Sequence, residues 1–207
     1  MRTCFALLAV VGAVSAQGLG PRATPAEYQT QAASGKFTIA AEFRGHAVPV
    51  AQGSPLTSED YIVVEAGLYG PPESRLVLSL TDFSLRVNGK KQGLESLPSG
   101  MVVGSLKDPD WEPPTPPSSK GGKTSINGGG GGGGGDSKDP PAPVKIPIEV
   151  QRSMAQRTQK AAMPEGDRPL PQAGLLFFKY GGKTKGIRSL ELVYDGPAGR
   201  ATLKLEP

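Results

Sequence analysis

Two copies of the tetrapeptide Gly-Gly-Lys-Thr, at 121–124 and 181–184, are the first residues of this chain that could bind a phosphate. Gly-Lys-Thr closes the phosphate-binding loop of nucleotide-hydrolysing enzymes, G-x-x-x-x-G-K-[ST]. The first glycine of that loop should fall at 117 and 177, but Pro117 and Phe177 stand there. We therefore predict no nucleotide site, and expect a linker at the first copy and a hairpin turn at the second.

The only histidine, His46, restricts nucleophilic and metal chemistry. A serine triad needs a histidine between a nucleophile and an acid, and the sequence has no G-x-S-x-G nucleophile motif. The turn-like run 44–47 indicates a solvated loop histidine. With a single histidine, and a single cysteine at Cys4 in a segment we expect to be removed, the sequence predicts no metal and no cofactor.

Pairs of carboxylates are the one kind of catalytic chemistry that the residue inventory leaves open. Glycoside hydrolysis uses two of them, about 5–10 Å apart in space. The pairs that are close in sequence or flank predicted strands are Glu59 with Asp60, Glu73 with Asp82, and Glu165 with Asp167. The first pair is typical of a solvated strand start and the last of a polar turn. We predict no catalytic residue, with a carboxylate-dependent, carbohydrate-active hydrolase on a β-sandwich as the alternative.

Trp111 stands alone in the acidic, proline-rich run 108–114. Such a run could be a short extended motif for a partner. We favour the interpretation that Trp111 is a linker residue that packs on its own domain, because a single aromatic side chain is weak evidence for a binding motif.

The charge pattern argues against nucleic acid as a partner. The chain has 23 Lys and Arg against 19 Asp and Glu, for a net charge of +4. Basic residues are scattered among acidic ones, and Lys90-Lys91 is the longest basic run. A nucleic-acid surface needs a basic stripe with stacking aromatics, which the sequence does not show.

The first sixteen residues have the pattern of a secretory signal peptide. A short basic start at 1–3 precedes an apolar run at 4–14, and Val14-Ser15-Ala16 forms a small-residue cleavage site before Gln17. The run is too short to span a membrane, and no later segment reaches about 18 apolar residues. Cys4 precedes most of the run, which disfavours a lipid anchor. We expect a secreted or periplasmic protein with no membrane span in its mature chain.

Composition divides the rest of the chain. Residues 107–145 contain two proline-rich blocks around eight consecutive glycines, Gly128 to Gly135. Such a segment cannot bury enough apolar surface to offset its ordering entropy, so we predict a disordered insertion. We also predict a flexible N-terminal segment at 17–34.

Strand patterns flank the insertion on both sides. Before it they lie at 37–43, 61–69, 76–80 and 83–87, with a weaker one at 101–103. After it they lie at 174–180, 187–194 and 201–205. Asn88-Gly89 is a strong signal for a two-residue hairpin turn. A helix is predicted at about 147–163, with Pro147 at its first turn and Pro164 ending it.

Neither flank alone has enough strands to cover a core. Together, 35–105 and 146–207 supply seven or eight strands, which is the size of a β-sandwich. The fold class we predict is mainly β, an immunoglobulin-like antiparallel β-sandwich. It forms a single domain over 35–207, with the 107–145 insertion and one peripheral helix.

Short motifs in both flanks resemble those of telokin-like, immunoglobulin-like extracellular domains of bacteria. The matching residues are Tyr61 to Glu65, Leu78 to Leu85 with the Asn88-Gly89-Lys90 turn, and Gly174 to Phe178. The long insertion and the helix depart from that family. The resemblance implies a secreted, non-catalytic sandwich. We therefore expect a binding or structural module of the cell envelope, whose partner is an envelope protein or a glycan.

Overall fold

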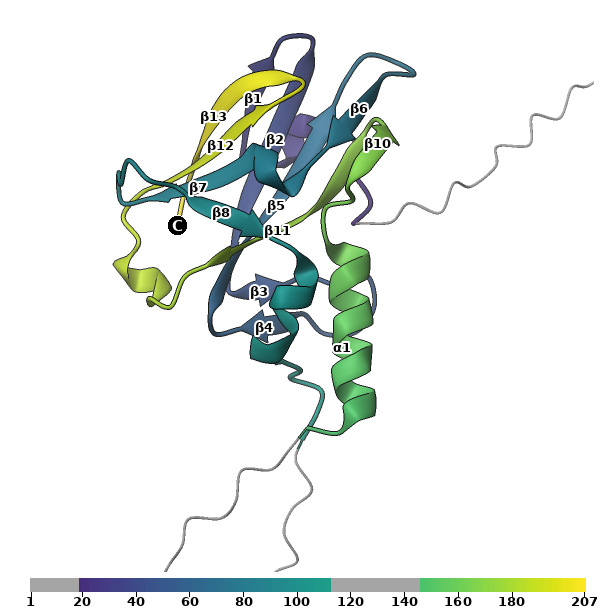
Figure 1. Cartoon of the computed structure of the whole chain (residues 1–207), viewed down its shortest axis with the longest axis vertical. Helices are drawn as coiled ribbons and strands as arrows, with labels where there is room; N and C mark the ends of the chain where they lie inside the picture. Colours follow the sequence, from purple (N-terminus) through teal and green to yellow (C-terminus); the bar gives the residue numbers. More distant parts are fainter. Residues whose placement is uncertain (1–18, 113–145) are drawn as a thin grey trace, which may run out of the picture.

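The computed structural model describes residues 19–112 and 146–207 (Figure 1). The predicted signal peptide and most of the predicted insertion lie outside these residues. Residues 107–112, which we assigned to the insertion, belong to the folded part. Strand β9 (Leu106–Lys107) pairs with strand β4 (Leu56–Ser58). Asp110 accepts hydrogen bonds from Ser54, so local partners hold this segment, and the predicted start of the insertion at 107 is wrong.

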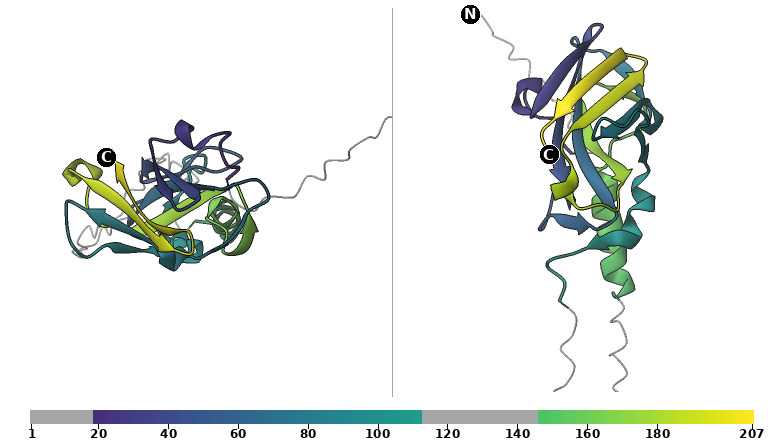
Figure 2. Two further views of the ribbon diagram at one scale, coloured as in Figure 1. Left: turned by 90° about the horizontal axis from the view of Figure 1, so that it is seen from above. Right: turned by 90° about the vertical axis from the view of Figure 1, so that its left-hand side faces the viewer.

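Eight strands form one antiparallel sheet that curls on itself. Their order is β1-β2-β5-β11-β8-β7-β12-β13, and β13 returns beside β1. The curl is visible from above in Figure 2. In chain order the strands are β1 (Thr30–Ser34), β2 (Phe37–Gly45), β5 (Tyr61–Tyr69), β7 (Phe83–Val87), β8 (Leu94–Leu97), β11 (Gln172–Lys179), β12 (Leu190–Gly196) and β13 (Gly199–Leu205).

The mainly β, antiparallel character of the fold is confirmed. The immunoglobulin-like sandwich is not, because the strand order is continuous from β1 to β13 and the sheet is nearly closed and barrel-like. Its interior holds the main core, to which strand β7 contributes alternate residues, Phe83, Leu85 and Val87. Alternation arises because successive side chains of a strand point to opposite faces.

A second apolar cluster lies on the outside of the sheet. There, helix α1 (Ile148–Ala161) and a three-stranded sheet of β3 (Ala47–Val48), β4 and β9 cover strands β5 and β11. Met154 of α1 packs with Val63 and Phe177 of the large sheet. Strand β5 is therefore buried on both faces, which explains its nearly continuous apolar sequence.

Helix α1 occupies the predicted 147–163 region. Pro147 is its N-cap residue, and the helix ends at Ala161. Ala162 then forms a parallel bridge to Leu175, and Met163 N donates to Leu175 O at 3.0 Å. A contact with β11 thus fixes the end of the helix one turn before Pro164.

The remaining elements are short. Strand β6 (Arg75–Leu78) pairs with β10 (Gly166–Pro169) beside the large sheet. The predicted strand at 101–103 is wrong: short 3-10 turns occupy this region, in which Val102 is buried and Met101 is exposed. The 3-10 helices are Pro25–Glu27, Leu80–Asp82, Ser99–Met101, Val103–Ser105 and Thr184–Gly186.

The predicted flexible segment at 17–34 is ordered from residue 19 onward. Arg22 lies 4.2 Å from the ring centroid of Tyr28 and pairs with Glu42 and Glu65. Tyr28 in turn meets Tyr69 edge-on. These contacts, and the pairing of β1 with β2, order this segment. Its own composition did not indicate an ordered structure.

The two flanks of the insertion share one sheet. Strand β11, from the second flank, lies between β5 and β8 of the first. In the register of β5 and β11, Phe177 is opposite Val63 and Leu176 is opposite Val64. Among the described residues, no helix has the length and apolar character needed to cross a membrane.

Candidate functional site

The second Gly-Gly-Lys-Thr copy lies in the connection between β11 and β12. Thr184 begins a three-residue 3-10 helix there, not the α-helix that follows a phosphate-binding loop. The first copy lies outside the described residues.

His46 lies at the turn from β2 to β3 and is half-buried, not solvated as predicted. Its Nδ1 atom is 2.8 Å from the carbonyl oxygen of Tyr61. A ring nitrogen that carries a proton can donate to this carbonyl. The contact ties the turn to strand β5, so the role of His46 is structural.

Three of the predicted carboxylates, Glu59, Glu165 and Asp167, contact a base or a backbone amide. Glu59 pairs with Lys107, and Asp167 pairs with Arg75. Glu165 Oε1 accepts from Leu80 N at 3.3 Å. In the described parts of the chain, no three His, Cys, Asp or Glu side chains are grouped as metal ligands. The geometry does not favour the hydrolase alternative.

Asp82 has the most distinctive environment of these carboxylates. A Cβ atom added at Gly196 would lie 2.6 Å from Asp82 Oδ2 and 2.7 Å from the Tyr194 hydroxyl. The carboxylate is thus packed against the backbone of β12. Burial raises the pKa of Asp82, and Asp195 adds to the rise. Asp195 itself pairs with Arg200, so no second free carboxylate faces Asp82 for acid–base work.

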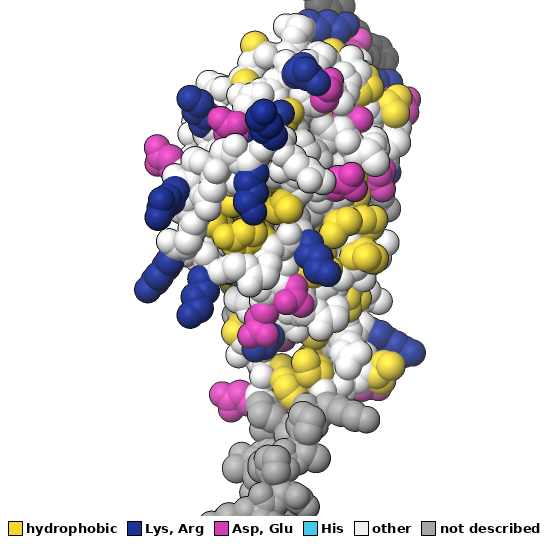
Figure 3. All heavy atoms as spheres, turned by 60° about the vertical axis from the view of Figure 1, so that its left-hand side comes forward, with side chains coloured by type: hydrophobic (Ala, Val, Ile, Leu, Met, Phe, Trp, Pro, Cys, Tyr) yellow, Lys and Arg dark blue, Asp and Glu magenta, His cyan; other side chains and the backbone are white. Residues whose placement is uncertain are grey.

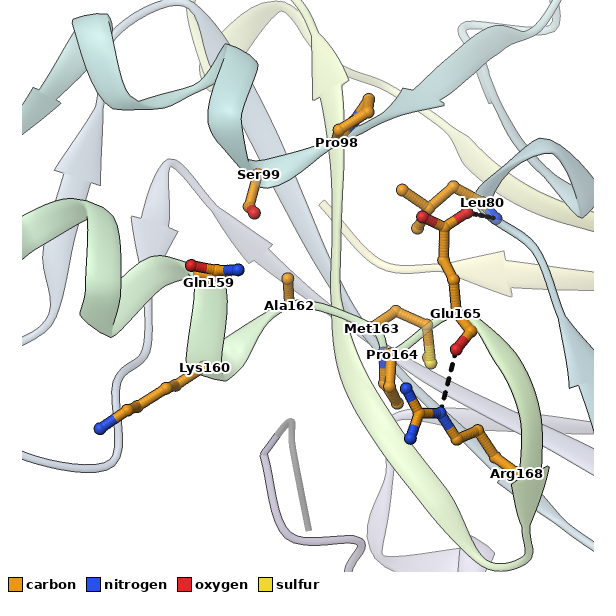
Figure 4. A pocket seen from close by; sticks show the side chains of 10 residues that line it. All are labelled: Leu80, Pro98, Ser99, Gln159, Lys160, Ala162, Met163, Pro164, Glu165 and Arg168. Atoms are coloured by element: carbon orange, nitrogen blue, oxygen red, sulfur yellow. Dashed lines mark hydrogen bonds between the residues drawn. The ribbon is translucent and has the colours of Figure 1, made fainter.

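An open pocket of about 400 Å³ lies between the end of α1 and the residues after β8 (Figure 4). Glu165 and Arg168 line it, but Glu165 already accepts from Leu80 N, and Arg168 Nε donates to Glu165 O at 3.0 Å. Figure 4 shows Lys160 pointing away from the opening. The pocket therefore offers no free acid and base in reach of one another.

Trp111 packs on its own domain, as the interpretation we favoured requires. It is half-buried and lines a shallow hollow with Val150 and Ser153 of α1. Beside it, hydrogen bonds from Ser54 lower the pKa of Asp110. These contacts anchor the chain where the insertion begins.

Two loops at one side of the large sheet carry a group of exposed cations. The β7–β8 turn, 88–93, carries Lys90 and Lys91, and the β11–β12 connection, 180–189, carries Lys183, Lys185 and Arg188. Both loops project to the left in Figure 1. We call them the basic loop pair.

Asn88 joins the two loops. Its Nδ2 donates to Gly186 O at 3.0 Å, and its Oδ1 accepts from Arg188 N at 2.6 Å and from Ser189 N at 3.3 Å. The predicted Asn88-Gly89 turn is present, with φ values of 54° and 68°. The turn is closed by Lys90 N, which donates to Val87 O at 3.2 Å. It is not the two-residue hairpin that we predicted, because residues 88–93 separate β7 from β8.

The second loop is also fixed from inside. Ile187 is buried in the main core, and its N–H donates to Thr184 O at 2.9 Å. The backbone that carries Lys183, Lys185 and Arg188 therefore has a defined path, although the side chains themselves extend into solvent.

The basic loop pair is locally uncompensated. Neither loop contains Asp or Glu, and none of the five cations forms an ion pair with a carboxylate of the described residues. Figure 3 shows Lys and Arg side chains projecting over this side of the molecule, around a small apolar area. Such a surface attracts anions even though the net charge is only +4.

The sequence showed these cations as scattered, because the two loops are far apart along the chain. Only the pairing of β7 with β12 brings their ends together. The one local signal was Asn88-Gly89, which predicted the turn but not its partner.

No family model matches the chain, and no curated protein matches it. One solved structure that it matches is a Bacillus subtilis strain 168 protein (ycdA) classed provisionally as a lipoprotein, with 12% identity and a TM-score of 0.38. The match covers 87% of this chain and 39% of the Bacillus chain, so the present chain spans well under half of that protein.

Proposed function

We propose that this chain is an exported, non-catalytic binding module of the cell envelope that binds an anionic partner through the basic loop pair. The observation that carries the proposal is the set of five exposed cations without a described carboxylate partner, on two loops locked together by Asn88. Cations with no internal partner are free to pair with an external anion.

The proposal contains no catalytic step. Among the described residues, two of the carboxylates that could serve a hydrolase are held in ion pairs, Glu59 with Lys107 and Asp167 with Arg75. The pocket beside α1 contains a carboxylate and a guanidinium that are both engaged. A binding role accounts for the free charges better than a reaction does.

The location in the envelope rests on the signal-peptide pattern of residues 1–16. The resemblance to telokin-like, immunoglobulin-like domains belongs to the same proposal, since that family implies an extracellular, non-catalytic module. Two of its motifs, at 61–65 and 174–178, lie on the paired strands β5 and β11. An acidic envelope protein or an anionic glycan would suit the loop pair as a partner.

Binding to dextran sulfate, with neutral dextran as the reference, tests the proposal on the purified, exported protein. The basic-loop variant K91Q/K183Q/K185Q should bind dextran sulfate at least about tenfold more weakly than the wild type. The control variant K36Q/R152Q/K160Q removes three exposed cations from other elements and leaves the same net charge; it should bind almost as the wild type does. Equal weakening in both variants would show that net charge, and not the loop pair, determines binding.

A further inference from the structure

We infer that the anionic partner of the basic loop pair is the phospholipid headgroup surface of a membrane, on which the domain sits peripherally. This inference rests on the proposed function, and it names the partner that the shape and chemistry of the two loops fit.

The cations lie on two exposed loops that are held next to each other. Lys90 and Lys91 follow Gly89 at the tip of a hairpin, and Lys183 and Lys185 lie in the neighbouring glycine-flanked loop. Because Asn88 holds the two loops together, the loops lie on the same side of the sheet (Figure 1), and Figure 3 shows Lys and Arg side chains projecting over this side. An extended layer of phosphates can contact several of them at once, whereas a small anion can contact only one or two.

The loops lack the groups that recognise rings. Tyr180 is the one aromatic residue in 88–93 and 180–189, and it is partly buried against the main core. Single-stranded nucleic acids are held by exposed aromatic side chains on which bases stack. The amide of Asn88, which could read hydrogen-bonding groups, is already used between the loops. The surface therefore binds through charge and not through stacking on rings.

The contact should be electrostatic and reversible. The large apolar side chains that are exposed in the described residues are Val77, Met101 and Ile148, and none belongs to the loop pair. The loops thus have nothing to insert into the hydrocarbon. Each lysine or arginine near an anionic bilayer strengthens binding about fivefold, and salt screens this attraction.

Co-sedimentation of the purified, exported protein with vesicles tests the inference. The vesicles contain phosphatidylcholine alone or an equimolar mixture with phosphatidylglycerol. We expect the wild type and K36Q/R152Q/K160Q to sediment with the anionic vesicles only, and to be released by raised salt. K91Q/K183Q/K185Q should bind them about 100-fold more weakly, with an unchanged thermal unfolding midpoint showing that it is folded.

Four outcomes would overturn the inference. Equal binding of the two triple variants to anionic vesicles, or equal binding of the wild type to both kinds of vesicle, would show that the loop pair is not a membrane contact. Wild-type protein that binds dextran sulfate through the loop pair but ignores anionic vesicles would overturn the inference and leave the proposed function intact. Failure of the wild type to bind either dextran sulfate or anionic vesicles would overturn both the inference and the proposed function.

Discussion

Asn88 Oδ1 accepts a hydrogen bond from the backbone N–H of Arg188, 100 residues further along the chain, at 2.6 Å. The bond links the turn after β7 to the loop before β12, and it does so from a residue with a φ of 54°. One side chain therefore supports the hairpin and positions the cations of the neighbouring loop.

Replacing Asn88 separates its two contributions to stability. N88G keeps the positive φ accessible but removes three side-chain hydrogen bonds, and N88A removes the bonds and also strains the backbone. We expect N88G to lose about 1–2 kcal/mol of unfolding free energy and N88A about 1 kcal/mol more. Chemical denaturation of N88G and N88A measures the two losses of unfolding free energy. Equal stability of N88A and N88G would show that φ at this position carries no strain.

Glu65 is the buried carboxylate of an ion-pair network on the outside of the sheet. It is 5% exposed, and Arg44 Nη2 and Arg22 Nη2 lie 2.5 Å and 3.2 Å from its Oε2 atom. E65Q leaves both guanidinium groups without this partner, and we expect a loss of about 2–3 kcal/mol. The control D167N breaks an ion pair whose side chains are both more than half exposed, and should cost under about 1 kcal/mol. The denaturation midpoints of E65Q and D167N measure these losses of stability. Similar losses in the two variants would contradict the placement of Glu65 in a buried ion-pair network.

Gly174 of strand β11 lies against the backbone that follows α1. A Cβ atom at Gly174 would lie 2.3 Å from Met163 Cα and 2.5 Å from Met163 N, which are backbone atoms that cannot rotate away. G174A should therefore cost about 3 kcal/mol or more. At Gly104 an added Cβ meets nothing within 4 Å, so G104A should leave the thermal midpoint nearly unchanged. A folded, fully stable G174A variant would mean that α1 does not end against β11.

The raised pKa of Asp82 gives stability a pH dependence. Burial disfavours the charged carboxylate, and Asp195 adds repulsion. The folded state therefore loses stability as the pH rises from the unfolded-state value, 3.8 for a free side chain, through the raised folded value. D82N has no charge to bury, so it should unfold at higher urea concentration than the wild type at neutral pH. The difference should vanish near about pH 3, where the wild-type carboxyl is protonated in both states.

The control for Asp82 is D167N, on an exposed ion pair. It should change stability little at either pH. The backbone of Ser79 also donates a hydrogen bond to the Asp82 carboxylate, which lowers its pKa and opposes the effect of burial. An Asp82→Asn variant that is less stable than the wild type at neutral pH would show that this hydrogen bond outweighs burial.

The interleaved sheet predicts that neither flank folds alone. Residues 19–112 lack β11, and without it β5 and β8 are left with open edges and the second core loses Leu175 and Phe177. We expect this fragment to show no cooperative thermal transition by circular dichroism. Replacing 113–145 with about eight Gly and Ser residues should preserve folding, since the cost of loop closure depends only weakly on length. A cooperative transition of the isolated fragment would contradict a shared core.

Local sequence signals predicted the local structure well. The Asn88-Gly89 turn, the alternating residues of β7 and the helix that follows Pro147 each depend on neighbours within a few positions. The weak strand at 101–103 failed because a buried Val102 is compatible with a 3-10 turn as well as with a strand. The N-terminal segment at 19–34 failed because its order comes from Glu42, Glu65 and β2, which are distant in sequence.

By itself, the sequence determined the strand-rich character of the domain and the turn at Asn88-Gly89, because φ preferences and side-chain alternation act within a few residues. Only the tertiary structure decided that the strands form one curled sheet and not two packed sheets, because strand order depends on pairings such as β5 with β11 across the insertion. It also decided the candidate site. Lys90 and Lys91 join Lys183, Lys185 and Arg188 only once β7 pairs with β12 and Asn88 bonds to the following loop.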